Sequence, residues 1–376
     1  MAAGGWERGF RRNLTSYGDD AFSLFLRKVF LKSMGYTEEA IDRPIVGITN
    51  TFSAYNSCHA NVPALVEAIK RGVMQAGGLA FEFPTISLHE SFAYPTSMYL
   101  RNLMSMDAEE MIRAQPMDAV VLIGGCDKTV PALLMGAASA GVPAILTVTG
   151  PMLTGAYRGE RVGACTDCRR FWARFRSGEV EEADVATITD QLAPTPGTCM
   201  VMGTASTMAL TAEALGMMLP GGASIPAVYS ERLRHAERTG TRAVEIARER
   251  LTPERIMTAA AFENALRVLL AVGGSTNGII HLTAVAGRLG VRVDLERFDE
   301  LSRTTPVIVD LKPTGRHYMQ ELHAAGGFTA VLRELAPLLD LDCTTVTGRS
   351  WREELEAAPP PWPQEVVRPS PTPRAG

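Results

Sequence analysis

The sequence has few cysteines and no excess of positive charge. Its 376 residues contain six cysteines, which is too few for the disulfide framework of a small secreted protein. Lysine and arginine number 37 against 41 aspartate and glutamate residues, so the formal net charge is −4. Nucleic-acid affinity depends largely on lysine and arginine contacts with phosphates. The composition therefore gives no reason to expect a nucleic-acid partner.

Targeting and membrane segments are also lacking. The first twenty residues carry charges with no apolar stretch behind them, so we expect no secretory signal. The longest run without a charged residue covers residues 129–157, but three prolines and four glycines interrupt it. A buried helix, a turn and a strand explain such a run better than a membrane span. We therefore expect a cytoplasmic protein with no membrane partner.

The sequence has no local motif for a nucleotide or for zinc. Its six histidines form no HxxxH or HExxH pair, and its glycine-rich turns contain no GxGxxG or Walker loop. One Cys-x-x-Cys pair is present, formed by Cys165 and Cys168. Zinc would require a second pair, and a redox role would require a thioredoxin-like context that the sequence does not show. We interpret these two residues as incidental thiols.

Apolar runs typical of strands alternate with helical stretches in the first half of the chain. Hydrophobic residues make up 46% of the sequence, which is enough to build a core. Four short runs are expected to be strands, at residues 44–49, 85–88, 119–123 and 144–148. Helices are expected between or after them, at residues 62–75, 95–104 and 130–140. This alternation predicts an α/β fold, a three-layer α/β/α domain with a mainly parallel sheet.

The second half is more helical, and the end of the chain is rich in proline. Helices are expected at residues 204–215, 252–272 and 277–289. Seven of the 23 prolines fall in the last 18 residues, a density that disfavours both helix and central strand. We therefore expect an N-terminal helical arm at 1–43, an α/β domain at 44–350 and a proline-rich linker or tail at 351–376.

Three cysteines are expected at equivalent positions in this sheet. Cys58 and Cys126 each follow an expected strand, and Cys199 precedes the helix expected from residue 204. Ligands of open α/β sheets gather at the carboxyl ends of strands, where helix N-termini favour thiolates. Thiolates placed there could hold iron or an iron–sulfur cluster. Spacing alone leaves the alternative open, because many free cysteines are simply buried as small apolar side chains.

Charged residues lie beside two of these cysteines. Asp127 and Lys128 come directly after Cys126, and Glu90 follows the second expected strand. The two carboxylates suit Mg²⁺, which commonly uses one or two carboxylates together with substrate oxygens. They could equally be solvated loop charges. His59 and His89 adjoin the same residues and could contact a substrate or occupy satisfied core positions.

Several short blocks, taken together, resemble a known family. They are Asn-Ser-Cys-His-Ala-Asn at 56–61, Gly-Cys-Asp-Lys-Thr at 125–129, Pro-Gly-Thr-Cys-Met at 196–200, Gly-Thr-Ala-Ser-Thr-Met at 203–208, Gly-Gly-Ser-Thr-Asn at 273–277 and Asp-Leu-Lys-Pro-Thr-Gly at 310–315. In this order they resemble the dihydroxy-acid/phosphogluconate dehydratase family over residues 19–368. The resemblance implies a hydro-lyase, a carbon–oxygen lyase that removes water from a 2,3-dihydroxy carboxylate to give a 2-keto acid.

The resemblance also implies cofactors. Cys58, Cys126 and Cys199 match the family's cluster cysteines, and a [2Fe-2S] or [4Fe-4S] cluster would act as a Lewis acid on the departing 3-hydroxyl. Glu90 and Asp127 match the ligands of Mg²⁺. Lys128 matches a lysine that is carbamylated in some members, which would make it a third oxygen ligand. Cys165 and Cys168 match no cluster position.

The resemblance also bears on the substrate and on the C-terminal domain of the family. The resemblance implies a role in sugar-acid metabolism or in amino-acid biosynthesis. Glu90 stands where the branched-chain enzymes usually show aspartate followed by glycine, so we favour a sugar acid as the substrate. Members are expected to be homodimers or homotetramers when intact. They also carry a β-rich C-terminal domain that supplies the serine proposed as C2 base, and no such segment is visible here. The alternative is therefore a truncated, catalytically inactive remnant that at most binds the cluster.

Overall fold

A four-stranded parallel sheet is the centre of the computed structural model, which describes residues 9–14 and 18–370. Its strands are β1 (Ile45–Asn50), β2 (Leu79–Pro84), β3 (Ala119–Gly124) and β4 (Ala144–Val148), in the order β2–β1–β3–β4. Every residue of β3 and β4 is buried, as expected for parallel strands covered on both faces. The strand β4 ends the sheet, but its outer edge is covered where Leu146 pairs with Met218. The predicted α/β fold with a parallel sheet is confirmed.

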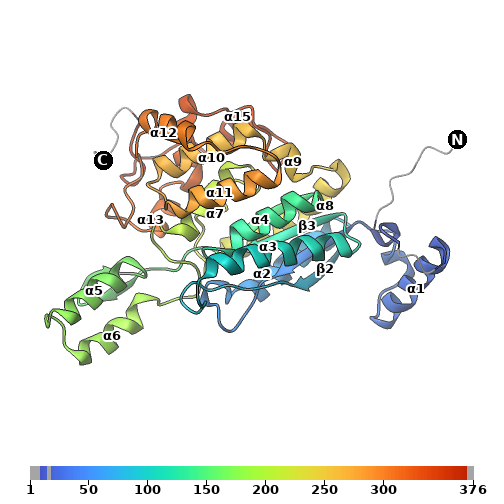
Figure 1. The fold of residues 1–376 in the computed structure, drawn as a ribbon, viewed down its shortest axis with the longest axis horizontal. Helices are drawn as coiled ribbons and strands as arrows, with labels where there is room; N and C mark the ends of the chain where they lie inside the picture. The colour runs from blue at the N-terminus through green and yellow to red at the C-terminus, as the bar shows by residue number, and fades with distance from the viewer. Residues whose placement is uncertain (1–8, 15–17, 371–376) are drawn as a thin grey trace.

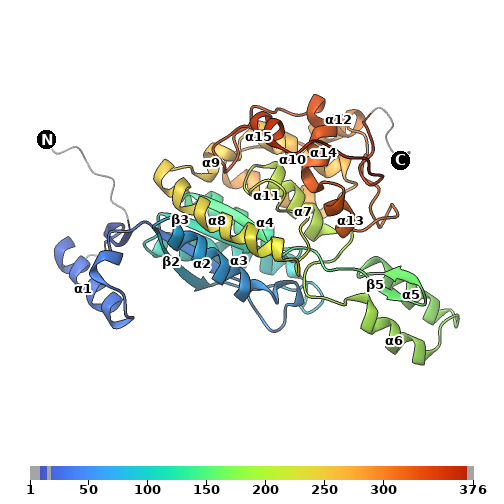
Figure 2. The same ribbon diagram turned by 180° about the vertical axis from the view of Figure 1, so that it is seen from behind.

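Helices cover both faces of this sheet. The helices α2 (Val62–Gln75) and α8 (Ser230–Glu249) pack together on one face, and α3 (Ser97–Ala114) and α4 (Thr129–Ala140) pack on the other (Figures 1 and 2). The helix α4 is apolar around almost its whole circumference, because it lies between the sheet and further helices. These are the three expected layers.

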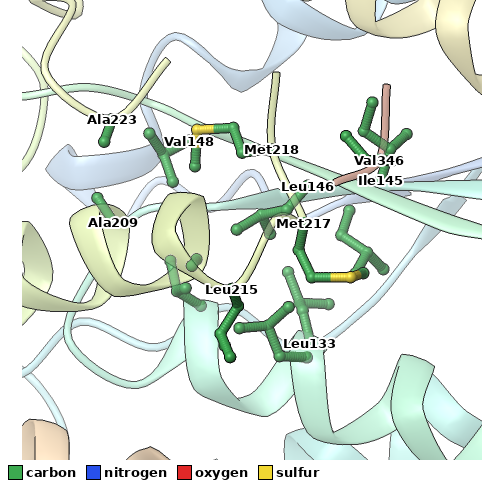
Figure 3. Close-up of a cluster of buried hydrophobic side chains, with 14 of the residues drawn as sticks. Leu133, Ile145, Leu146, Val148, Ala209, Leu215, Met217, Met218, Ala223 and Val346 are labelled. Atoms are coloured by element: carbon green, nitrogen blue, oxygen red, sulfur yellow. The ribbon is translucent and has the colours of Figure 1, made fainter. Parts of the chain in front are cut away.

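A second helical layer continues from β4. It contains α7 (Thr204–Ala214), α9 (Pro253–Ile256), α10 (Ala259–Ala271), α11 (Asn277–Arg288), α12 (Leu295–Thr304), α13 (Met319–Ala324), α14 (Gly327–Leu335) and α15 (Trp351–Ala357). Figure 3 shows how side chains from β4, α4 and the segment after α7 meet in one apolar cluster. The backbone follows the same contact, since Leu146 N–H donates to the carbonyl of Met217. No helix in the described ranges is long and apolar enough to cross a membrane.

Two smaller parts project from this body (Figure 1). At the N-terminal side lie the short 3-10 turns Gly9–Arg11 and Glu38–Ala40, with α1 (Asp20–Ser33) between them. Between β4 and α7 the chain forms a lobe from the hairpin β5 (Gly155–Tyr157) and β6 (Glu160–Val162) with α5 (Thr166–Arg176) and α6 (Glu182–Leu192). The lobe has its own small core, formed by Val162, Phe171, Val180, Ile188 and Leu192.

Two expected elements are placed differently by the structure. The strand expected at 85–88 is wrong, because the second strand is Leu79–Pro84 and the following residues turn away toward α3. There, the Thr85 hydroxyl and the Ile86 N–H both donate to the Asp107 carboxylate. The single helix expected at 252–272 is divided into α9 and α10, because Thr258 caps the second helix by accepting from Ala261 N–H.

The segment expected as a linker or tail packs against the helical layer as far as it is described. Trp351 begins α15, is 2% exposed, and donates its indole N–H to the carbonyl of Ala214. Further along, Val367 is buried and pairs with Val309. The apolar residues among the prolines explain this packing. The domain limits at 43 and 350 remain a prediction.

The close crossing of α2 and α8 depends on glycine. A Cβ atom at Gly72 would lie 1.9 Å from the carbonyl oxygen of Glu237, and one at Gly240 would lie 2.2 Å from that of Ile69.

We expect Gly72→Ala to lower the free energy of unfolding by about 1–3 kcal/mol, because backbone atoms must separate. On α11, Gly287 is exposed with open space around it, so Gly287→Ala should raise stability by about 0.5–1 kcal/mol. Urea unfolding measures both, and equal effects would contradict the close-crossing explanation.

Candidate functional site

The candidate site lies where the order of the strands reverses. The chain passes from β1 to β2 on one side and from β3 to β4 on the other, so the loops after β1 and β3 leave in opposite directions. In open α/β sheets this switch point forms a crevice at the carboxyl ends of the strands. The loop after β1 carries Cys58, and the turn between β3 and α4 carries Cys126, Asp127 and Lys128.

Asn56 shapes the loop that carries Cys58. Its side-chain carbonyl accepts the Cys58 N–H at 3.1 Å, which starts the 3-10 turn Ser57–His59. Its amide group donates to the carbonyl of Leu88 at 3.0 Å. One side chain therefore sets the turn at Cys58 and holds it beside the loop that leads to Glu90.

His59 joins the loops after β1 and β3. Its ring is buried, and burial lowers its pKa to about 4, so the imidazole is neutral near pH 7. The Nδ1–H donates to the carbonyl of Thr51 at 2.8 Å, which leaves Nε2 to accept the Cys126 N–H at 3.2 Å. His59 thus occupies a satisfied core position, one of the two roles considered from the sequence.

The packing around His59 leaves no room for a side chain at the end of β3. A Cβ atom at Gly125 would lie 2.4 Å from the Thr149 hydroxyl and 2.9 Å from the His59 ring. The Gly125 N–H instead donates to the Thr129 hydroxyl at 2.9 Å. The glycine before Cys126 is therefore required by this close approach.

Two of the predicted cysteines meet in this crevice. The Sγ atoms of Cys58 and Cys126 and a ring nitrogen of His89 lie within 4.8 Å of one another. Both cysteines are only 4% exposed. Their shared hydrogen bond is the main cause that lowers the pKa of Cys126 and raises that of Cys58, so the proton of the pair stays on Cys58. This is a soft donor set that suits iron.

The third predicted cysteine, Cys199, lies near this pair but contacts another thiol. Its loop is held beyond β4 by the pairing of Pro151 with Thr198. Its Sγ atom is 2.8 Å from that of Cys165, and this contact, burial and charges that include Cys126 and Asp127 raise its pKa. Within the described residues it does not join the group formed by Cys58, His89 and Cys126.

The contact of Cys165 with Cys199 is not indicated by any pattern in the sequence. Cys165 and Cys199 are 34 residues apart, and the two helices of the projecting lobe, α5 and α6, lie between them in the chain. No local motif could reveal the contact, since it depends on how the lobe returns to the sheet. Cys168, the other cysteine of the Cys-x-x-Cys pair, packs against the lobe's own apolar core.

Glu90, Asp127 and Lys128 converge beside the thiols. The Lys128 ammonium lies 3.1 Å from a carboxylate oxygen of Glu90 and 3.8 Å from one of Asp127. The lysine side chain is only 4% exposed, so its positive charge is held between the two carboxylates in a largely buried place. The three residues predicted from the sequence are brought together, and whether they bind a metal remains a prediction.

The two carboxylates differ in their electrostatic surroundings. Burial opposes ionisation of Glu90, but hydrogen bonds from Ser97 and Lys128 outweigh it and lower the pKa of Glu90. Burial raises the pKa of Asp127; Lys128 opposes this shift and the charge of Glu90 adds to it. The N–H of Ala205, at the start of α7, also bonds Asp127 and connects the site with the helical layer.

Hydroxyl and amide groups from two of the other sequence blocks lie at the N-termini of α7 and α11. The hydroxyls of Thr204 and Ser275 are 3.0 Å apart, and the Asn277 amide donates to Thr204 at 3.2 Å. Blocks that are about 70 residues apart in the sequence thus meet at one place. They place polar groups next to the helix that contacts Asp127.

Residues 43–354 match the family model described as "Dihydroxy-acid/6-phosphogluconate dehydratase N-terminal". The chain belongs to this family. The match covers the sheet, the helical layer and every candidate site residue, and it confirms the resemblance drawn from the sequence blocks.

Relatives in the dehydratase family include sugar-acid and dihydroxy-acid enzymes. The chain is 46% identical over 362 residues to an L-arabonate dehydratase of Azospirillum brasilense, an alignment that covers 95% of this chain and 62% of that protein. It is 44% identical over 369 residues to an L-arabinonate dehydratase of Rhizobium leguminosarum bv. trifolii, covering 97% and 63%. A dihydroxy-acid dehydratase of Ignicoccus hospitalis is 39% identical over 348 residues, covering 90% and 62%. The chain thus spans less than two thirds of the length of these relatives.

The role of His59 can be tested by measuring the stability of variants. We expect His59→Ala to lower the free energy of unfolding by about 3 kcal/mol, because the Thr51 carbonyl and the Cys126 N–H both lose their buried partner. His89→Ala is the matched control, since this ring is partly exposed, and should change stability by about 0.5 kcal/mol. Urea unfolding of the metal-free chain measures both. A smaller loss for His59→Ala than for His89→Ala would contradict the proposed connection between the loops.

Proposed function

We propose that this chain carries the cluster and metal sites of a hydro-lyase that removes water from a 2,3-dihydroxy carboxylate to give a 2-keto acid. The observation that carries the proposal is the position of two different donor sets at one switch point. Thiols of Cys58 and Cys126 lie beside the oxygens of Glu90 and Asp127. Dehydration needs one group to assist the departing hydroxyl and another to stabilise charge at the carboxylate end of the substrate.

The thiol set fits an iron–sulfur cluster. Cys58 and Cys126 are buried and near each other, and the charge of Cys126 acts on Cys199. Three thiolates suit either a [2Fe-2S] or a [4Fe-4S] cluster, with one iron left open. When bound, the cluster would supply a Lewis acid for the hydroxyl that leaves C3. The contribution of the protein is to orient Cys126, whose backbone N–H is held by His59.

The oxygen set fits Mg²⁺. The Lys128 ammonium already occupies the position of a cation between Glu90 and Asp127. Addition of carbon dioxide to its amine would convert this cation into a third carboxylate and leave room for a hard metal. When bound, Mg²⁺ would stabilise the negative charge that develops as the C2 proton leaves. Ser97, which donates to Glu90, fixes the orientation of that carboxylate.

The substrate class proposed here is a sugar acid. Two of the more similar relatives are named L-arabonate and L-arabinonate dehydratase, at 46% and 44% identity, against 38–42% for four proteins named dihydroxy-acid dehydratase. Glu90 also favours a sugar acid, because branched-chain enzymes of the family usually show aspartate and glycine at this position.

The cluster assignment has a direct test. We expect anaerobic purification to give a brown chain whose visible absorption is lost in Cys126→Ser, because a buried thiolate ligand is removed. The control is Cys168→Ser, which alters a thiol in the lobe core. Iron and sulfide content should follow the colour. A variant Cys126→Ser that keeps its full absorption and iron would show that the cluster is bound elsewhere.

The reaction can be tested on the cluster-loaded chain with Mg²⁺. We expect 2-keto acid to form from aldonates faster than from 2,3-dihydroxy-3-methylbutanoate, and Glu90→Gln to reduce the rate by at least about 100-fold through loss of a metal ligand. Removal of Mg²⁺ should have the same effect. A loaded chain that forms no 2-keto acid from any of these substrates would favour the alternative of a remnant that binds the cluster without turnover.

A further inference from the structure

Cys165 has no part in the proposed chemistry, yet its thiol lies 2.8 Å from that of Cys199. Cys165 is exposed, whereas Cys199 is partly buried at the edge of the candidate site. The only other described pair of adjoining thiols, Cys58 with Cys126, is buried on both sides. The surface pair is therefore the one that a small oxidant in solution can reach first.

A buried hydrogen-bond network holds Cys165 in this place. Two residues further on, Asp167 is 1% exposed and accepts the N–H of Gly163 at 2.9 Å. The same carboxylate accepts the Tyr318 hydroxyl at 2.9 Å and lies 3.4 Å from the Lys312 ammonium. Since Lys312 and Tyr318 lie in the segment between α12 and α13 of the helical layer, this network fastens the start of α5 to the body of the molecule. The position of Cys165 is thus set by buried contacts, although the residue itself is exposed.

The loop of Cys199 is held from the other side. The Met152 N–H donates to the Thr198 carbonyl, and the Thr198 N–H donates to the Gly150 carbonyl, both at 2.9 Å. The Ser206 hydroxyl, in the first turn of α7, lies 3.3 Å from the carbonyl of Cys199 itself. Both backbones are therefore fastened independently, and their thiols still meet. This is the arrangement that a disulfide requires, since it needs little backbone movement.

We propose that Cys165 and Cys199 form a reversible disulfide when a peroxide reaches the chain without its cluster. One thiolate attacks a peroxide oxygen, the oxygen–oxygen bond breaks, and a sulfenic acid and hydroxide form. The second thiol then attacks the sulfenic sulfur, and the sulfur–oxygen bond breaks to release water. In sum, two thiols and hydrogen peroxide give one disulfide and two waters; both sulfurs are oxidised and the peroxide is reduced. A small thiol reverses the step by exchange at the exposed Cys165 sulfur.

The disulfide would protect Cys199 from irreversible oxidation and would prevent the chain from taking up its cluster. It occupies Cys199 before further peroxide can convert that thiol to a sulfinic acid, which ordinary thiols do not reduce. It also removes Cys199 from the thiols available to a cluster, a consequence that rests on the proposed function. Only reduction would then return the chain to a form that can take up iron and sulfide. On this account Cys165 is the thiol that keeps a ligand cysteine in a form that reduction can restore.

Peptide mapping of the full chain tests the proposal. The cluster-free, reduced chain is treated with equimolar hydrogen peroxide, blocked with N-ethylmaleimide, digested with trypsin and analysed by mass spectrometry. We expect two of the six free thiols to disappear and a peptide linking residues 162–169 to 177–232 to form, both reversed by dithiothreitol. Because Cys165 and Cys168 share the first peptide, the same link must form in Cys168→Ser and fail to form in Cys165→Ser. Circular dichroism confirms that both variants are folded.

Several results would overturn the disulfide. A dominant link between Cys165 and Cys168, a link between two chains, or oxidation of Cys199 without any link would each show that the contact is not used. A comparison of the chain with and without its cluster distinguishes failure of the disulfide from failure of the proposed cluster site. The cluster-bearing chain should form the disulfide at least about 10-fold more slowly, because its Cys199 is occupied. If both forms react equally fast, the disulfide stands and Cys199 is not a cluster ligand.

Discussion

The hydrogen bonds of one buried neutral histidine connect the two loops on which the candidate site depends. Parallel strands β1 and β3 end at the same edge of the sheet, but the loops that follow them run to opposite sides. His59 bonds the backbone of its own loop through Nδ1 and that of Cys126 through Nε2. A protonated imidazole could not accept the second bond, so the burial that keeps the ring neutral also keeps the loops together.

Charge balance is the second constraint on this edge of the sheet. Two carboxylates lie near Cys126, whose pKa is lowered by its hydrogen bond with Cys58, and a single lysine ammonium lies between the carboxylates. Like charges at this separation raise the cost of ionising each group unless cations are present. The opposite directions of the pKa shifts of Glu90 and Asp127 express this competition. A site with these properties gains stability from any bound cation, which agrees with the proposed metal and cluster.

The sequence reveals those parts of the fold and site that depend on local patterns. The strand β3 is a run of apolar residues between a charge and two glycines, and it is buried on both faces, so its ends are visible in the sequence. The edge strand β2 is partly exposed and lacks this signal, so the sequence pattern favours a strand at 85–88 instead. Cys58, Cys126 and Asp127 could be predicted to converge because each follows a strand of one parallel sheet. The contact of Cys165 with Cys199 could not, since it depends on Asp167 and Tyr318, which are 151 residues apart.

The lobe explains why a cysteine outside the family pattern can influence the site. It begins after β4 and ends just before Cys199, so its base adjoins Cys199 by connectivity alone. Asp167, Lys312 and Tyr318 then fix the orientation of that base through buried bonds. A residue at the start of α5 is consequently presented to Cys199, while Cys168, less than one helical turn further on, points into the lobe core. The two members of the Cys-x-x-Cys pair thus differ in surroundings because the helix between them turns one toward the site and the other away from it.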